Sequence, residues 1–329
     1  MKQALFYQKK SGNNVQCDLC PRNCTISPDK TGVCNVRKNI DGKLYSLVYE
    51  KPCSVSIDPI EKKPLYHFLP GSKALSIGTI GCNFFCKGCQ NFDIARAKSE
   101  EHQFKTVSCQ EVVQIARQKN CPIIAYTYNE PTVFYEYMLD TVKLAKEQGI
   151  KNIAVSNGYI NEAPLRELCK VLDGVNIDLK SFSTAFYKEY TKGSIEPVKR
   201  TIKILKEEGI YFEITNLLIP GLNDDLVEFE NMCKWIATLS KDTVLHISRF
   251  FPFYRAKDIA PTPEKTIDQA ARIARKHLNY VYVGNMGREQ HTLCPACAKI
   301  VVERGLLGVK VIMENGKCSC GKEIPGIWN

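Results

Sequence analysis

The sequence predicts an α/β protein whose core is a partial parallel (β/α)6 barrel, with small cysteine-rich metal-binding modules at both ends. Two observations lead to this prediction. Between residues 73 and 284, short apolar runs rich in β-formers alternate with amphipathic helical stretches, which is the pattern of right-handed βαβ crossovers in a parallel sheet. In addition, most of the 16 cysteines among the 329 residues are clustered. In a reducing compartment, such clusters indicate metal ligands before disulfides.

Each predicted strand is an apolar run bounded by turn residues. The strands are expected at 74–80, 123–128, 153–156, 175–179, 212–218, 245–250 and 280–283. The helix-patterned stretches between them include 133–148, 164–172, 197–208, 226–239 and 263–277. We therefore expect an N-terminal cysteine-rich metal-binding module and lead-in over 1–71, the barrel core over 72–288, and a zinc-ribbon-like module over 289–329.

The overall composition is that of a globular protein, with 44% hydrophobic and 24% charged residues. No apolar stretch approaches the roughly 18 residues of a membrane span, and residues 1–14 lack the apolar core of a signal peptide. We therefore expect a cytoplasmic protein. The formal net charge is +10, and thiolates bound to metal would reduce it. The mildly basic surface that is left permits an acidic partner or RNA without requiring one.

Three cysteines follow the first predicted strand in a Cys-x3-Cys-x2-Cys loop, namely Cys82, Cys86 and Cys89. Parallel α/β folds bind ligands at the C-terminal ends of their strands. Three thiolates at this spacing can ligate three irons of a [4Fe-4S] cluster and leave the fourth iron open, whereas electron-transfer clusters usually have four thiolate ligands. The alternative is a zinc knuckle with a remote fourth ligand.

This loop resembles the signature of the radical S-adenosylmethionine (SAM) enzymes, which have a TIM-like partial barrel. Nearly the whole chain is similar to the AmmeMemoRadiSam-system members of that superfamily, relatives of the glycyl-radical-enzyme activating enzymes. The similarity includes Cys-Asp-Leu-Cys-Pro-Arg-Asn-Cys near the N-terminus and the segment 58–71. It implies that the open iron binds SAM, and that one-electron reduction yields a 5′-deoxyadenosyl radical, which abstracts hydrogen from an unidentified substrate. It also implies an electron donor such as flavodoxin or ferredoxin, and partners from Memo-like and Ammecr-like families.

Residues after the next three strands extend the resemblance and imply SAM contacts. Asn129 and Glu130 stand in place of a Gly-Gly-Glu-Pro-like segment that binds the amino group of SAM, although the two glycines are absent. Ser156 and Asn157 resemble a Thr-Asn-Gly segment near the ribose and carboxylate. Asp178-Leu179-Lys180 matches the Asp-Leu-Lys of the activating enzymes, where a carboxylate can pair with the SAM ammonium and a lysine with its carboxylate. The alternative for this last pair is a local ion pair.

Two positions depart from the family pattern. Gly88 stands where many members have an aromatic residue that supports the adenine, so we expect Phe84 or Phe92 to take that role. Tyr254 stands where the activating enzymes have a histidine. The second departure weakens a direct transfer of activating-enzyme function to this chain.

Two further cysteine sets flank the predicted barrel. The C-terminal set has the four-thiolate pattern of a zinc ribbon, with an auxiliary iron-sulfur cluster or free thiols as the alternatives; it comprises Cys294, Cys297, Cys318 and Cys320. The N-terminal set suits zinc or a second [4Fe-4S] cluster and comprises Cys17, Cys20, Cys24 and Cys34. The turns expected at Pro21 and Asn23 favour zinc at the N-terminal set.

Three functions are compatible with these features. The first is hydrogen abstraction from a small molecule or cofactor precursor. The second is the installation of a glycyl radical on a partner protein, which the Asp178 to Lys180 segment supports. The third is an RNA-binding or RNA-modifying protein with zinc modules, for which the net charge is the main argument.

Overall fold

The computed structural model of the chain describes residues 1–99, 105–305 and 308–329. Its centre is an eight-stranded sheet of order β14-β13-β12-β11-β10-β9-β8-β7. Strands β8 to β14 run parallel, and β7 pairs antiparallel with β8. The strands are β7 (Ser54–Pro59), β8 (Lys73–Gly78), β9 (Ile123–Tyr126), β10 (Lys151–Ser156), β11 (Gly174–Asp178), β12 (Tyr211–Leu218), β13 (Val244–Arg249) and β14 (Val281–Gly284). The predicted parallel α/β architecture is confirmed.

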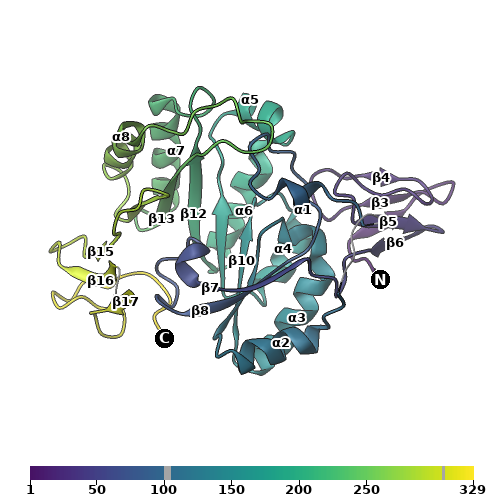
Figure 1. Cartoon of the computed structure of the whole chain (residues 1–329), viewed down its shortest axis with the longest axis horizontal. Helices are drawn as coiled ribbons and strands as arrows, with labels where there is room; N and C mark the ends of the chain where they lie inside the picture. The colour runs from purple at the N-terminus through teal and green to yellow at the C-terminus, as the bar shows by residue number, and fades with distance from the viewer. Residues whose placement is uncertain (100–104, 306–307) are drawn as a thin grey trace.

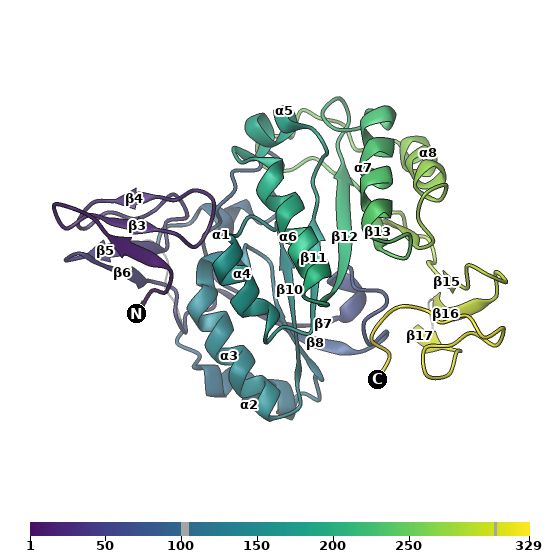
Figure 2. The same cartoon turned by 180° about the vertical axis from the view of Figure 1, so that it is seen from behind.

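Helices cover the outer face of this sheet, as Figure 2 shows for α3, α4, α6 and α7. The longer helices are α2 (Cys109–Gln118), α3 (Tyr135–Glu147), α4 (Glu162–Cys169), α6 (Ile195–Glu207), α7 (Leu226–Leu239) and α8 (Glu264–Ala274). Each is amphipathic: α6, for example, buries Ile195, Val198 and Ile202 on one stripe. Shorter turns are η1 (Ile60–Lys62), α1 (Phe92–Arg96), η2 (Pro131–Phe134), α5 (Thr184–Phe186) and η3 (Tyr187–Thr191). Of the helices described, none is both long and apolar enough to cross a membrane.

The sheet begins earlier in the chain than expected, because β7 lies within the range 1–71 assigned to the N-terminal module. Its sequence, Ser-Val-Ser-Ile-Asp-Pro, is exposed or half-buried throughout. The alternation of polar residues with Val55 and Ile57 is the period-2 pattern of an edge strand, not the continuous apolar run that predicts the buried strands. Residues 60–71 then close the barrel end where β8 begins, since Ile60, Leu65 and Phe68 pack against Ala74 and Ile123.

The two terminal modules lie on opposite sides of the barrel (Figure 1). The N-terminal module has two three-stranded sheets, β1-β6-β5 and β2-β3-β4. Their strands are β1 (Lys2–Gln3), β2 (Tyr7–Lys9), β3 (Val15–Cys17), β4 (Thr25–Ile26), β5 (Arg37–Ile40) and β6 (Lys43–Ser46). The C-terminal module is a sheet of β15 (Thr292–Leu293), β16 (Ile300–Gly305) and β17 (Gly308–Val311). Apolar residues of both modules pack into clusters shared with the barrel, so neither module is a loosely tethered appendage.

Candidate active site

The three loop cysteines lie between β8 and α1, at the C-terminal edge of the parallel strands. Asn129 holds the start of this loop, since its Nδ2 donates to the carbonyl oxygens of Gly81 at 2.7 Å and Ile80 at 3.2 Å. Arg96 holds the first cysteine by donating to the carbonyl oxygen of Cys82 at 2.7 Å. The chain can turn here because Gly81 has a φ of +91°, and a Cβ at that position would lie 2.6 Å from the carbonyl oxygen of Cys34.

All three cysteines line one cavity of about 560 Å³, within the usual range for small-molecule and cofactor sites. Residues from all seven parallel strands, or from the loops that follow them, reach this cavity, which requires the sheet to curve around it. Of the residues proposed from the sequence, those on its wall are Cys82, Cys86, Cys89, Asn129, Glu130, Asn157, Asp178 and Lys180. Ser156 is not on the wall and lies behind it.

Burial governs the ionisation of the loop thiols. It raises the pKa of Cys86 to about 11, against the lowering effect of nearby Lys180. It also raises the pKa of Cys82 and of Cys89. Such thiols become thiolates only when a bound cation offsets the lost solvation. Three sulfur donors at the wall of an otherwise open cavity therefore fit a [4Fe-4S] cluster with one iron left for a second ligand.

Glu130 is a buried carboxylate whose oxygens are occupied by four hydrogen-bond donors. Its Oε1 accepts from the amide and hydroxyl of Thr132 at 3.0 and 2.7 Å and from the hydroxyl of Ser156 at 2.8 Å. Its Oε2 accepts from the amide of Asn157 at 2.8 Å. Burial raises the pKa of Glu130, whereas these donors lower it. Glu130 thus ties the end of β9 to the end of β10.

The Asn157 side chain connects this network to the cluster loop. Its Nδ2 donates to Oδ1 of Asn83 at 2.8 Å and lies 3.9 Å from Sγ of Cys82. Its Oδ1 accepts from the amide of Tyr159 at 2.9 Å. Asn157 therefore stands beside the first cluster ligand, and its amide orientation is determined by partners on both sides.

Asp178 and Lys180 form an ion pair on the cavity wall, with Nζ 2.9 Å from Oδ2. Burial opposes the lysine charge, but Asp178 and the Cys86 thiol raise the pKa of Lys180 well above its usual value. Leu179, between them, is fully buried on the other side of the strand end. The cavity thus presents an ammonium and a carboxylate side by side, next to the second loop cysteine.

Aromatic residues surround the place where Gly88 lacks a side chain. A Cβ at Gly88 would lie 2.5 Å from the hydroxyl of Tyr190, which accepts from the Gly88 amide at 2.9 Å. Tyr190 stacks on Phe186, and both line the cavity together with Phe84. Phe92 is 39% exposed and stacks on Tyr254 instead. Sequence reasoning missed Phe186 and Tyr190, because they come from the short helices α5 and η3 that follow β11.

A second group that sequence reasoning missed lines the deep part of the cavity. Asp58 of β7 accepts from Nζ of Lys63 at 2.8 Å and from the hydroxyl of Tyr128 at 2.7 Å. Lys63 and Tyr128 lower the pKa of Asp58 to about 2, against burial, which raises it. Tyr128 has a φ of +73°, an unusual conformation for an aromatic residue, and Asn91 donates to its carbonyl oxygen at 2.6 Å. The position of Tyr128 just after β9 was the available sequence signal.

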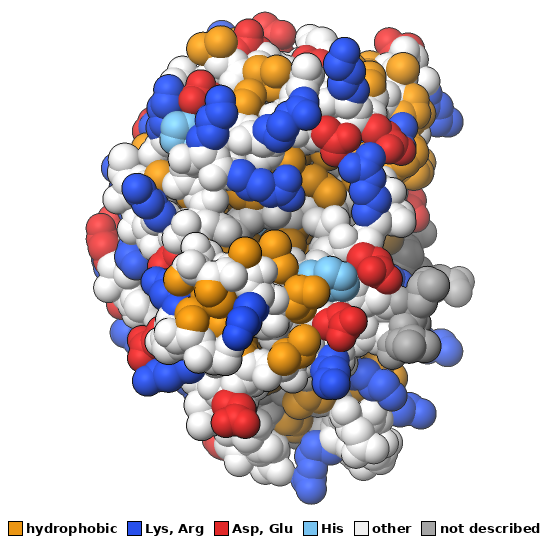
Figure 3. All heavy atoms as spheres, turned by 90° about the vertical axis from the view of Figure 1, so that its left-hand side faces the viewer, with side chains coloured by type: hydrophobic (Ala, Val, Ile, Leu, Met, Phe, Trp, Pro, Cys, Tyr) orange, Lys and Arg blue, Asp and Glu red, His pale blue; other side chains and the backbone are white. Residues whose placement is uncertain are grey.

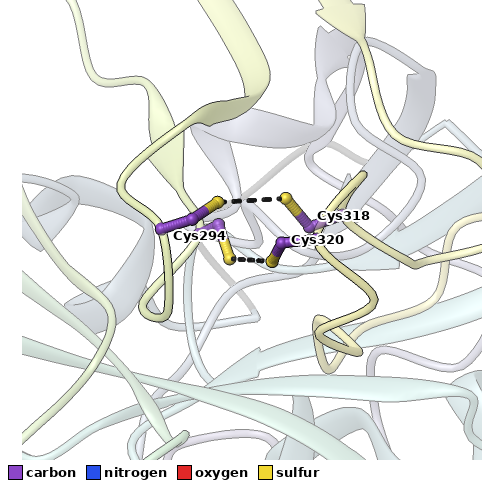
Figure 4. A group of neighbouring side chains, drawn as sticks. Cys294, Cys318 and Cys320 are labelled. Carbon is purple, nitrogen blue, oxygen red and sulfur yellow. Dashed lines mark hydrogen bonds between the residues drawn. The ribbon is translucent and has the colours of Figure 1, made fainter.

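The C-terminal cysteines converge as the sequence predicts (Figure 4). The sulfur atoms of Cys294, Cys297, Cys318 and Cys320 all lie within 4.8 Å of one another. The Cys294–Cys320 and Cys297–Cys318 sulfur pairs are each 3.6 Å apart. A tetrahedral zinc with Zn–S bonds of about 2.3 Å needs sulfur atoms about 3.8 Å apart. This group can therefore hold a single metal ion.

The N-terminal cysteines share a different, smaller cavity. Its wall contains Cys17, Cys20, Cys24 and Cys34 together with Arg37, Asn83 and apolar side chains. Among the residues that the structure describes, the C-terminal set is the one group of His, Cys, Asp or Glu side chains gathered tightly enough for a single ion. The N-terminal thiols thus line one cavity, but their sulfur atoms are not gathered closely enough to ligate a single ion.

Known proteins resemble this chain over all or part of its length. The family model described as the Radical SAM superfamily matches residues 76–236. An uncharacterised protein of Methanocaldococcus jannaschii is 42% identical over 332 residues, which cover 98% of this chain and 99% of that protein. A candidate glycyl-radical enzyme activating enzyme of the same organism is 26% identical over 223 residues, covering 64% of this chain and 80% of the relative.

Solved structures share the fold at low sequence identity. Streptococcus suis SuiB aligns with a TM-score of 0.50 at 12% identity, covering 68% of this chain and 51% of that one. A domain of the pyruvate-formate lyase-activating enzyme from Bacteroides vulgatus aligns with a TM-score of 0.44 at 18% identity, covering 49% of this chain and 98% of that domain. The SuiB alignment supports a common barrel and leaves the substrate open.

Proposed function

The chain belongs to the radical SAM superfamily. We propose that its cavity holds a [4Fe-4S] cluster and SAM, and that the enzyme abstracts hydrogen from a small organic substrate. One observation carries the proposal: the three loop thiols and the Asp178–Lys180 pair line the same cavity. When bound, the cluster and SAM supply a 5′-deoxyadenosyl radical, which removes a hydrogen atom from the substrate. The end-to-end resemblance further supports placing the chain in the AmmeMemoRadiSam subgroup.

In this proposal the side chains of the cavity bind and orient the cofactors. Cys82, Cys86 and Cys89 hold three irons. Asp178 pairs with the ammonium of SAM and Lys180 with its carboxylate, as charge-assisted bonds favour. Asn129 and Glu130, on the wall of the cavity, hold the cluster loop and the end of β10 in place, and Ser156 and Asn157 belong to the same network.

The remaining walls suit the adenine and the substrate. Tyr190, Phe186 and Phe84 offer aromatic faces beside Gly88, where the adenine would otherwise lack support. Asp58 and Lys63 lie further along the cavity, near the start of β8, because Asp58 pairs with Ala74 in the sheet register. We infer that these two polar groups face the substrate, since they line the cavity away from the cluster loop.

Release of 5′-deoxyadenosine tests this function. Anaerobically purified chain, reconstituted with iron and sulfide and given SAM and dithionite, should release it. Cys86→Ala should reduce the release to background, because the cluster loses one of its three ligands. Cys169→Ala is the matched control, since this cysteine lies on α4, away from the cavity, and release should persist. Absence of release from protein with a loaded cluster would contradict the proposal.

A second candidate, the activation of a glycyl-radical partner protein, has its own support. The relative described as a candidate glycyl-radical enzyme activating enzyme covers 64% of this chain, and the Asp178-Leu179-Lys180 segment matches that group. Phe251 and Phe253, in the loop after β13, are 37% and 40% exposed. A glycyl-radical enzyme from the same organism should then show a glycyl EPR signal after incubation with the reduced chain and SAM, and none without SAM.

We propose zinc at the C-terminal cysteines, since the two 3.6 Å sulfur pairs suit one tetrahedral ion. The module packs Val301 and Ile324 against Tyr280 of the barrel, so its metal would fasten the C-terminus to the barrel. The RNA-binding alternative gains little support from the surface. On the face that carries this module, acidic and basic side chains are interspersed without a continuous basic stripe (Figure 3).

A further inference from the structure

We propose that the four N-terminal cysteines hold a second [4Fe-4S] cluster, not the zinc that their turns favour at the level of sequence. Cys17 ends β3, Cys24 precedes β4, and Cys34 precedes β5, so three separate parts of the module contribute thiols to one cavity. Cys20 comes from the turn between β3 and β4, where the Asn23 amide donates to its carbonyl oxygen at 3.0 Å. The site is therefore assembled by the fold rather than by one short knuckle.

The spacing of the thiols separates this site from the C-terminal one. A single zinc ion draws its four sulfur atoms to about 3.8 Å from one another, and the C-terminal set has that arrangement. Within the described part of the chain, the N-terminal thiols are not gathered in this way. Cys82, Cys86 and Cys89, which line the larger cavity, are not gathered within 4.8 Å of one another either. A four-iron cube places each thiolate on a different iron and so needs the wider spread.

The cavity also contains a buried donor that lacks an acceptor. Arg37 lines it and is 2% exposed, and its Nε has no hydrogen-bond partner. The two other guanidinium nitrogens are occupied by Glu136 and by the carbonyl oxygen of Leu5. A buried N–H without an acceptor is costly, and the sulfides and thiolates of a cluster are acceptors. The rest of the wall is largely apolar, including Leu19, Ile26 and Val133.

This second site lies directly behind the catalytic loop. The carbonyl oxygen of Cys34 packs against Gly81, the residue before Cys82. Arg22, in the same cysteine segment, donates through Nε to the carbonyl oxygen of Asn83 at 2.9 Å. Asn83 itself lines the N-terminal cavity. The site is nonetheless independent of the proposed radical chemistry, because none of its four thiols lines the larger cavity.

A variant that lacks all three loop cysteines, Cys82→Ala, Cys86→Ala and Cys89→Ala, isolates the second site. After anaerobic reconstitution it should retain about four irons and four sulfides per chain. On reduction it should show a [4Fe-4S] EPR signal that SAM does not alter. Zinc analysis and circular dichroism report whether this chain is folded, because the C-terminal site is unchanged.

The complementary variant, Cys20→Ser with Cys24→Ser, should lose about half of the iron and sulfide that the wild-type chain binds and keep a SAM-sensitive signal. A chain with all seven cysteines replaced gives the background of adventitious iron. The proposal is overturned if the triple variant binds iron only at that background. It is likewise overturned if the triple variant gains a second zinc in place of iron. Both results can be told apart from failure of the radical chemistry, which concerns the loop cluster alone.

Discussion

At the scale of single residues, the cavity is built from side chains whose charge is set by their neighbours. Asp178 and Lys180 are two positions apart at the end of a strand, so both point to the same side. Burial alone would favour a neutral lysine, but the adjacent carboxylate and thiol keep the pKa of Lys180 high. The ammonium is therefore charged throughout the working pH range, and it is available to an anionic group.

Replacing this ammonium tests its role in binding SAM. Lys180→Met keeps the length of the side chain and removes the charge. A charge-assisted hydrogen bond contributes about 1.5–3 kcal/mol, so SAM should bind roughly 10- to 100-fold more weakly, as measured by equilibrium dialysis on the cluster-loaded chain. Lys199→Met is the matched control, because Lys199 forms a 3.1 Å pair with Glu196 on the surface of α6. Unchanged SAM affinity in Lys180→Met would remove the residue from the site.

At the scale of elements, the N-terminal module is joined to the barrel by a buried ion pair. Arg37 of β5 makes two hydrogen bonds to Glu136 of α3, at 2.8 and 3.0 Å, and both side chains are at most 2% exposed. Glu136 also accepts from the Leu5 amide at 2.8 Å. Removing one partner of such a pair leaves an uncompensated buried charge. The ion pair thus fixes the position of the N-terminal module relative to the catalytic loop.

Glu136→Gln should therefore destabilise the whole chain. The amide removes the negative charge and turns an NH2 toward existing donors, so the free energy of unfolding should fall by about 3 kcal/mol. Urea denaturation measures the loss, and limited proteolysis should show earlier cleavage within the N-terminal module. Glu147→Gln, at the exposed end of the same helix, should leave both measurements unchanged. Equal stability of the two variants would show that the ion pair contributes little.

At the scale of the whole molecule, the barrel end opposite the catalytic loop is closed by two segments that are distant in sequence. His67 is fully buried there. Its Nδ1 donates to the carbonyl oxygen of Pro325 at 2.8 Å, so its Nε2 must accept from the hydroxyl of Tyr282 at 2.6 Å. Glu213 lies in the same plug and accepts from the amide of His67 at 2.7 Å and from His246 at 2.5 Å. His246 is therefore inside the barrel.

This plug makes stability depend on pH in a defined direction. Burial lowers the pKa of His67 to about 4 from its usual 6.5. Between these values the unfolded chain binds a proton that the native chain does not, so stability falls as the pH falls through this window. Lowering the pH from 7.5 to 5 should therefore reduce the free energy of unfolding by about 2 kcal/mol through His67. Between the same two pH values, the free energy of unfolding of His67→Gln, measured with urea, should fall by about 2 kcal/mol less than that of the wild-type chain. An equal fall in the two proteins would contradict the assignment.

The sequence by itself determined the local parts of this protein. Seven parallel strands, from β8 to β14, and the helices α3, α4, α6, α7 and α8 follow from hydrophobic periodicity, because each element carries its own apolar face. Those strands and helices are found within a few residues of the predicted positions. The loop with Cys82, Cys86 and Cys89 and the C-terminal four-cysteine group were identifiable because metal ligands recur at short spacings.

Only the tertiary structure decided which distant residues complete each site. Tyr190 fills the place beside Gly88 from 102 positions away, and His67 meets Pro325 across 258 positions. Asp58 of β7 and Lys63, just after η1, reach the cavity because β7 adds an edge strand to the sheet beside β8. The spread of the N-terminal thiols likewise depends on how three strands fold together. Such contacts have no period along the chain, because they are selected by packing in three dimensions.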